Sequence, residues 1–282
     1  MSRKLRMAPF ALLAVSAMWG STFFLMKDAI KRQDVNSFLF TRFALAVLAM
    51  ILLRPQVVKH FSKDLLFKGF AAGCFLGSGY ILQTLGLELT TAAVTGFVTG
   101  LYVVATPLIA AVILRQKIEK KTWIYVTLAT IGLGLLSLHG WSVGRGEILV
   151  LGSAIAFAAH IIALGQWSKG RDAYALTIVQ LATCALMAGA GTFAKGYQSP
   201  PDTGVWAVVI FTALFATAIA FIVQTWSQAH MSPTKVAVIL TMEVVFAALF
   251  AVVFGHEVLT PQIAVGGVLV ITAMYLIVLE EA

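Results

Sequence analysis

The amino-acid sequence predicts an all-α integral membrane protein with ten transmembrane helices. The chain of 282 residues is 60% hydrophobic and only 11% charged, whereas soluble domains carry about 25% charged residues. The apolar residues form long continuous runs, each near the roughly 20 residues that a helix needs to cross a bilayer. Because lipid offers the backbone no hydrogen-bond partners, such runs are expected to be helices. The short alternating segments typical of a membrane β-barrel do not appear.

Short polar links separate the expected spans, and each span is bounded by charged, glycine or proline residues. In chain order the spans cover residues 8–26, 35–53, 69–87, 89–114, 122–138, 148–168, 173–194, 203–229, 232–255 and 258–279. The third span carries Gly69, Gly73 and Gly77, whose spacing of four favours close approach of a neighbouring helix. Pro107 in the fourth span removes one helical hydrogen bond and predicts a kink, which would suit a gate. Pro233 stands near the start of the ninth.

The net charge of +8 at first suggests a nucleic-acid partner, but the distribution of charge argues against one. With the N-terminus inside, most Lys and Arg residues fall in links on the inner side, as the positive-inside rule requires. The basic charge therefore reflects topology, and lipid is the expected partner instead of nucleic acid. We expect a multi-pass protein of the cell inner (plasma) membrane with both termini cytoplasmic.

The spans divide five and five about a glycine-rich link, which predicts two repeats at residues 1–140 and 148–282 with a linker at 141–147. Because each repeat has an odd number of spans, the second must be inverted relative to the first. Weak internal identity supports duplication. A shift of 140 places Val98 on Val238 and Val104 on Val244, and a shift of 141 places Gln83-Thr84 on Gln224-Thr225.

Three strongly charged residues, Arg42, Lys235 and Glu243, lie within expected spans. A charge at this depth is costly, so such residues usually face a wet cavity or each other. Glu243 is too deep to reach the interface, which favours a functional role. Lys235 either snorkels to the inner interface or lines a cavity. Arg42 is expected to tie helices together through backbone carbonyls, a structural or gating role shared with Pro107 and Pro233.

Other polar and aromatic residues near mid-span are candidates for the lining of a cavity. His160 is either a hydrogen-bonded core residue or a group that meets a substrate or a proton. A mostly apolar cavity with a few polar groups suits an amphipathic or aromatic solute. The candidate substrate-binding residues are Trp19, Tyr80, Gln83, Tyr102, His160, Gln224, Lys235, Met242 and Glu243.

No catalytic motif, phosphate loop or nucleotide fingerprint is present. The sequence therefore predicts no enzymatic activity, no catalytic residue and no cofactor. The two cysteines, Cys74 and Cys184, have no metal-ligand spacing, so we expect no metal site. The expected partner is a small-molecule substrate, and a monomer suffices for such a role.

Several short motifs together resemble the EamA-type transporters of the drug/metabolite transporter superfamily. They are the Ala-Met-Trp-Gly-Ser-Thr-Phe run at 17–23, the stretch from Thr91 to Pro107, Ser232-Pro233, Glu243-Val244 and Gly255-His256-Glu257. Two positions depart from the family pattern: Val244 replaces a usual proline, and Lys117 stands where an acidic residue is common. The resemblance covers the whole chain, is closest to YddG-type exporters of aromatic and other amino acids, and implies export of small metabolites.

Together these observations predict a secondary transporter that works by alternating access. The expected substrates are amino acids, aromatic and other neutral ones, bound in a central cavity between the two repeats near the bilayer midplane. Glu243 and Lys235 would hold the ammonium and carboxylate of an amino acid, or Glu243 would carry a proton. The alternatives are a passive channel or facilitator for small amphipathic solutes, and a non-transport membrane subunit.

Overall fold

The computed structural model describes residues 3–90, 92–137, 144–255 and 260–279, and these residues form helices and links without any strand. The helices of the first half are α1 (Arg3–Arg32), α2 (Val35–Leu53), the 3₁₀ helix η1 (Pro55–His60), α3 (Lys63–Leu89), α4 (Ala92–Gly100), α5 (Tyr102–Ile113) and α6 (Lys120–Ser137). Those of the second half are α7 (Arg145–Trp167), α8 (Ala173–Lys195), α9 (Thr203–Ala213), the π-helix η2 (Leu214–Ile219), α10 (Ala220–Gln228), α11 (Pro233–Leu240), α12 (Met242–Gly255) and α13 (Pro261–Leu279). Parts of the predicted 141–147 linker, and Thr91, His256 and Glu257, lie outside the described residues.

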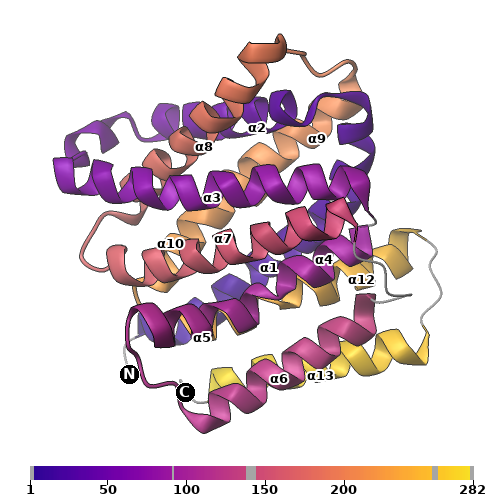
Figure 1. Ribbon diagram of the computed structural model, residues 1–282. Coiled ribbons are helices and arrows are strands. Elements are labelled where there is room, and N and C mark those ends of the chain that lie inside the picture. Colours follow the sequence, from indigo (N-terminus) through magenta and orange to yellow (C-terminus); the bar gives the residue numbers. More distant parts are fainter. Residues whose placement is uncertain (1–2, 91, 138–143, 256–259, 280–282) are drawn as a thin grey trace.

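Length and apolar composition identify the membrane-crossing helices among the described residues. Seven helices or continuous runs are long and apolar enough to cross a bilayer, and α1 makes an eighth when its two segments, which meet at 43° between Phe23 and Leu25, count as one. The chain is therefore a multi-span helical membrane protein. Its helices lie side by side in one bundle, with the N-terminus and C-terminus at the same end (Figure 1).

Two of the expected spans are broken, and the breaks occupy matching positions in the two halves. The fourth span divides at Leu101 into α4 and α5, and the ninth divides at Thr241 into α11 and α12. At Leu101 the amide donates to the Val98 carbonyl, three residues back. At Thr241 the amide is shared between the carbonyls of Ala237, four residues back, and Val238, three residues back. The break in the first half does not coincide with Pro107, which lies inside α5.

Contacts between helices are also reciprocal between the halves. The packing of α1 against α12 corresponds to that of α7 against α4 and α5, and the packing of α3 against α8 corresponds to that of α9 and η2 against α2. The packing of α3 against α7 corresponds to that of α9, η2 and α10 against α1. Two other large contacts, α2 with α8 and α6 with α13, join equivalent helices of the two halves. Each half therefore completes its packing only against the other.

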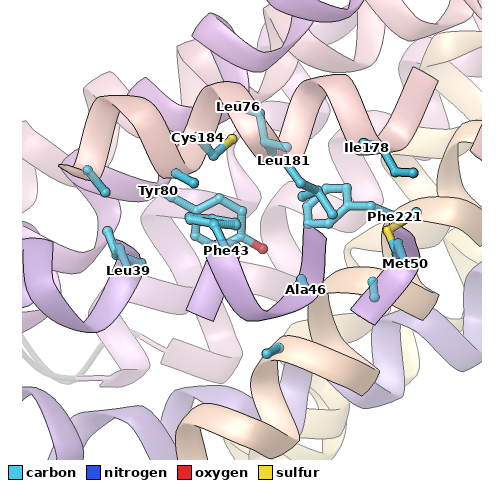
Figure 2. Packing of buried hydrophobic residues seen from close by; sticks show 14 of the residues in the cluster. Leu39, Phe43, Ala46, Met50, Leu76, Tyr80, Ile178, Leu181, Cys184 and Phe221 are labelled. Carbon is cyan, nitrogen blue, oxygen red and sulfur yellow. The ribbon is translucent and has the colours of Figure 1, made fainter. Parts of the chain in front are cut away.

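Two hydrophobic cores result, and each draws on both halves of the chain. The first contains side chains of α2, α3, α8 and α9, where the rings of Phe43 and Tyr80 pack at 5.2 Å (Figure 2). The second contains side chains of α5, α6 and α11 to α13. Trp19 of α1 and Phe157 of α7 pack against both cores. The boundary between the cores therefore runs past these two aromatic residues.

Glycines permit the closest helix contacts. A Cβ atom on Gly73 would lie 2.6 Å from Thr183 Cβ and 2.7 Å from the Gln180 carbonyl oxygen, so the glycine ridge of α3 packs tightly on α8 as predicted. A Cβ atom on Gly20 would lie 2.5 Å from the carbonyl oxygen of Glu243. That contact fixes the first turn of α12 against the middle of α1.

Ion pairs join the two halves at both ends of the bundle. At the end that holds the termini, Arg54 binds Asp172, which caps α8, at 2.9 Å. At the other end Arg32 binds Asp202, which caps α9, at 2.7 Å. Each contact therefore uses an arginine of the first half and an acidic helix cap of the second.

Candidate functional site

A cavity lies between the two cores, with about 620 Å³ of space that no atom fills, adjoining open solvent included. Its wall combines apolar, aromatic, amide and charged side chains from both halves. The lining residues are Trp19, Thr22, Phe23, Met26, Arg42, Leu76, Tyr80, Gln83, Leu87, Thr99, Tyr102, Phe157, His160, Ile161, Phe221, Gln224, Leu240 and Glu243.

Most of the residues selected from the sequence meet in this cavity. Trp19, Tyr80, Gln83, Tyr102, His160, Gln224 and Glu243 all line it, although they come from α1, α3, α5, α7, α10 and α12. The break at Thr241 places Glu243 in the first turn of α12. The break at Leu101 likewise makes Tyr102 the first residue of α5. The two broken helices thus deliver their leading side chains to one space.

Two of the selected residues do not line the cavity. Lys235 is half-buried in the first turn of α11, on the far side of the break from Glu243. Met242 is 5% exposed and packs within the second hydrophobic core. The ninth span was expected to be one continuous helix, so the positions of these two residues relative to the break were not predicted.

Arg42, which the sequence suggested as a helix tie, both ties helices and lines the cavity. Its Nε donates to Thr217 Oγ1 at 2.7 Å, and one terminal nitrogen donates to the Ala216 carbonyl oxygen at 3.4 Å. The other terminal nitrogen lies 3.3 Å from Met26 Sδ. The guanidinium also stacks 5.0 Å above the centre of the Tyr80 ring. Arg42 therefore joins α2 to α1, α3 and the π-helix.

The π-helix η2 was not predicted from the sequence. Its six residues, Leu214–Ile219, interrupt the eighth span beside the cavity. Trp19 Nε1 donates to the Ala216 carbonyl at 2.8 Å, the same oxygen that Arg42 meets. Single π-turns within longer helices occur often at functional sites. Here the altered ladder accommodates two side-chain donors at one carbonyl.

Three buried polar atoms in the wall lack a hydrogen-bond partner. They are Tyr102 Oη, Gln224 Oε1 and Glu243 Oε1, and each of these residues is at most 5% exposed. Buried polar atoms in proteins are nearly always bonded, so atoms that are not bonded call for an explanation. All three can accept a hydrogen bond from a bound molecule.

His160 is a bonded core residue that also touches the cavity. Its Nε2 lies 2.7 Å from Gln180 Oε1. The amide nitrogen of Gln180 in turn donates to the Leu176 carbonyl at 3.2 Å. The hydrogen bond agrees with the interpretation of His160 as a satisfied core group, and its role toward a substrate or a proton stays a prediction.

Aromatic rings form most of the remaining wall. Phe221 lies 5.3 Å from Trp19, 6.0 Å from Tyr80 and 6.0 Å from His160, measured between ring centres. Tyr80 also meets Phe157 edge-on at 5.4 Å. Phe157 and Phe221 are not among the residues selected from the sequence. The alignment of Tyr80 with Phe221 at a shift of 141 could have identified Phe221.

The two prolines lie outside the lining. Pro107 is buried inside α5, and Pro233 is the first residue of α11, packed against Gly165. Among the described residues, no group of three or more His, Cys, Asp or Glu side chains could hold a metal ion.

Comparison with known proteins agrees with this architecture. The model of the EamA-like transporter family matches residues 6–138 and again residues 144–279. The chain belongs to the EamA-like transporter family. An uncharacterized transporter of Archaeoglobus fulgidus is 32% identical to this EamA protein over 274 residues, covering 97% of this chain and 86% of that protein. The uncharacterized transporter YoaV of Bacillus subtilis is 24% identical, with 94% of each chain covered.

A solved crystal structure shares the fold of this EamA protein. It superposes with a TM-score of 0.77 at 14% sequence identity and covers 97% of this chain and 96% of its own. The family and the relatives identify the protein as a membrane transporter and not an enzyme. The cavity between the two cores is therefore the candidate site for its cargo.

Proposed function

We propose that the protein is a secondary transporter that exports small metabolites, chiefly aromatic and other neutral amino acids, by alternating access through the central cavity. The observation that carries this proposal is the composition of the cavity. It holds one guanidinium, Arg42, and one carboxylate, Glu243, within a largely aromatic wall. An amino acid carries both opposite charges and, in many cases, an apolar side chain. The cavity offers a complementary group for each part.

The proposed mechanism rests on ten spans arranged as two inverted five-helix repeats. The matched breaks at Leu101 and Thr241, the reciprocal helix contacts and the twofold match of the family model support this arrangement. Transporters with inverted repeats place their site at the repeat interface, often on discontinuous helices. Here the two cores would rock against each other around the cavity, exposing it to one side of the membrane and then the other.

The proposed orientation places both termini in the cytoplasm of a cell whose inner membrane holds the protein. The end of the bundle that carries the termini also holds the links between α2 and α3, α5 and α6, and α7 and α8 (Figure 1). These links and their flanks are rich in Lys and Arg, including Arg54, Lys59, Lys117 and Lys169. The positive-inside rule favours such an end as the cytoplasmic one.

Uptake of labelled amino acids into liposomes, with and without a proton gradient, tests the proposal. We expect saturable transport that unlabelled substrate on the opposite side accelerates. A channel would show neither property. We expect Glu243→Gln to lower transport about tenfold or more, because a carboxylate that binds a cation contributes roughly 1.5–3 kcal/mol. Dependence of transport on pH would change in the same variant if Glu243 carries a proton.

A matched control is Glu88→Gln, which removes an exposed carboxylate near the end of α3. This variant should transport like the unaltered protein. Unchanged rate and pH dependence in Glu243→Gln would remove Glu243 from the site. The absence of transport for every neutral amino acid would refute the proposed cargo.

A further inference from the structure

The two charged residues of the cavity belong to opposite walls. Arg42 lies on α2 and contacts Tyr80 and the π-helix, on the side of the first core. Glu243 lies on α12 beside Tyr102, on the side of the second core. Arg42 and Glu243 form no ion pair with each other, and none of the ion pairs among the described residues includes either. The cavity thus separates a cation from an anion.

The partners of Arg42 in this structure carry no charge. They are a hydroxyl, a backbone carbonyl, a thioether and an aromatic ring, and the residue is only 1% exposed. A guanidinium has five N–H donors and binds a carboxylate through two parallel hydrogen bonds. Three of these donors are engaged, one of them by sulfur, a weak acceptor. A buried cation with neutral partners and spare donors is suited to receive an anion.

The opposite wall has the complementary deficiency. Tyr102 Oη, Gln224 Oε1 and Glu243 Oε1 are buried polar atoms that make no hydrogen bond of good geometry. The Tyr102 hydroxyl lies beside Glu243 and can donate to it, which leaves the other lone pairs of this group of atoms to a bound molecule. An ammonium group has three donors and no acceptor, so it can satisfy acceptors of this kind. Trp19, Phe157 and Phe221 also line the cavity and offer an apolar surface to a side chain.

We propose that Arg42 is the receptor for the carboxylate of the cargo, and that Glu243, with Tyr102 and Gln224, is the receptor for its ammonium. This assignment rests on the proposed function and deepens it, because it replaces Lys235, which lies outside the cavity, by a residue of the opposite repeat. The cargo then spans the two cores. Each terminal nitrogen of the guanidinium has one N–H that the structure leaves unengaged, so the carboxylate can bind without displacing Thr217 or Ala216.

The first test needs no variant and uses three probes that differ by one charged group. These are L-phenylalanine, phenethylamine, which lacks the carboxylate, and 3-phenylpropionate, which lacks the ammonium. If the liposome screen favours another neutral amino acid, the three probes are that amino acid, its analogue without the carboxylate and its analogue without the ammonium. Binding is measured on the purified full chain by competition with the labelled amino acid. The intact amino acid should bind at least about tenfold more tightly than either analogue, since each lacks one charge-assisted contact.

The second test assigns each charge to its receptor. Arg42→Lys keeps the positive charge but not the planar fork, so it should weaken the amino acid about tenfold and leave phenethylamine within about twofold. Glu243→Gln should weaken the amino acid and phenethylamine while 3-phenylpropionate is unchanged. The control is Arg54→Lys. Arg54 directly follows α2, the helix that carries Arg42, but it pairs with Asp172 away from the cavity. This variant should leave all three affinities unchanged.

The outcomes separate this assignment from the proposed function. Equal affinity of the unaltered protein for all three probes overturns the assignment even if amino acids are transported. Loss of phenethylamine binding in Arg42→Lys also overturns the assignment, because phenethylamine has no carboxylate for Arg42 to bind. If the unaltered protein neither binds nor transports any neutral amino acid, the proposed function fails and the assignment fails with it.

Discussion

The two halves of the protein bring equivalent positions to the cavity but give them different side chains. At a shift of 141, Trp19 corresponds to His160, Tyr80 to Phe221 and Gln83 to Gln224, and all six residues line the cavity. The shift of 140 that aligns the breaks at Leu101 and Thr241 places Val103 opposite Glu243. In the proposed repeat arrangement, the backbone supplies a symmetric frame. The differences between paired residues supply its polarity, with the carboxylate contributed by the second half alone.

The third span and its counterpart, the eighth, show how such differences reach the backbone. The third is one continuous helix, α3, whose glycines allow α8 to approach closely. At a shift of 141, Gly69, Gly73 and Gly77 correspond to Ile210, Leu214 and Ala218. In the eighth span these positions belong to α9 and the π-helix. One half therefore uses tight packing where the other uses an altered hydrogen-bond ladder that binds Trp19 and Arg42.

The largest expected effect comes from filling the contact between α1 and α12. We expect Gly20→Ala to lower the stability of the protein by about 1–3 kcal/mol, a typical cost of overpacking. The added methyl group would meet the backbone of Glu243 and Ala247 at 2.5 and 2.8 Å. Its counterpart at a shift of 141 is Ile161, so the second half has no such requirement. Thermal unfolding in detergent measures the change.

Gly267→Ala in α13 is the matched control, because a Cβ atom there would meet nothing within 4 Å. It should unfold at the same temperature as the unaltered protein or slightly above it. Equal stability of the Gly20 and Gly267 variants would contradict the close contact between α1 and α12.

A smaller effect should distinguish the two equivalent glutamines. Gln83 donates to Thr99 Oγ1 at 3.1 Å, whereas Gln224 donates to Gln228 Oε1 at 3.0 Å and leaves its own Oε1 unbonded. We expect Gln224→Leu to weaken amino-acid binding about threefold to tenfold, the value of one ordinary hydrogen bond. Gln83→Leu should instead lower the unfolding temperature, and it should weaken amino-acid binding less than Gln224→Leu does. A larger affinity loss for Gln83 would reverse these roles.

Ten spans were expected, and seven or eight of the described helices are long and apolar enough to cross a bilayer. The sequence predicted the helical membrane class, the family and seven of the 18 residues that line the cavity. These rest on apolar run length and on the cost of burying Glu243 or Arg42 in lipid, which are properties of the chain itself. The breaks were harder to predict. Thr241 has no glycine or proline beside it. In the fourth span the kink was predicted at Pro107, whereas the break lies at Leu101. The position of Lys235 relative to the break at Thr241 was therefore not predicted. The π-helix lies against α1 and α2 of the other half, and no local pattern indicated it.

The smallest expected effect compares the two ends of the bundle. Burial of its carboxyl would raise the pKa of Asp172, but hydrogen bonds from the Ala175 amide and Arg54 outweigh burial, so that pKa lies below its ordinary value of 3.8. At the other end the Val205 amide, with Arg32, lowers the pKa of Asp202. Stability from either carboxylate is therefore complete above pH 3.8 and is lost as the pH falls through the lowered pKa.

Asp172→Asn removes the charge but keeps a side-chain oxygen that can cap α8. We expect it to cost less than about 1 kcal/mol near neutral pH, because Arg54 is 39% exposed and water screens the pair. The variant should unfold with a weaker dependence on pH below about 4 than the unaltered protein. Asp202→Asn should behave in the same way at the opposite end, since both residues combine a helix cap with an arginine of the first half. If only one variant flattens the pH profile, the ion pairs at the two ends contribute unequally to holding the halves together.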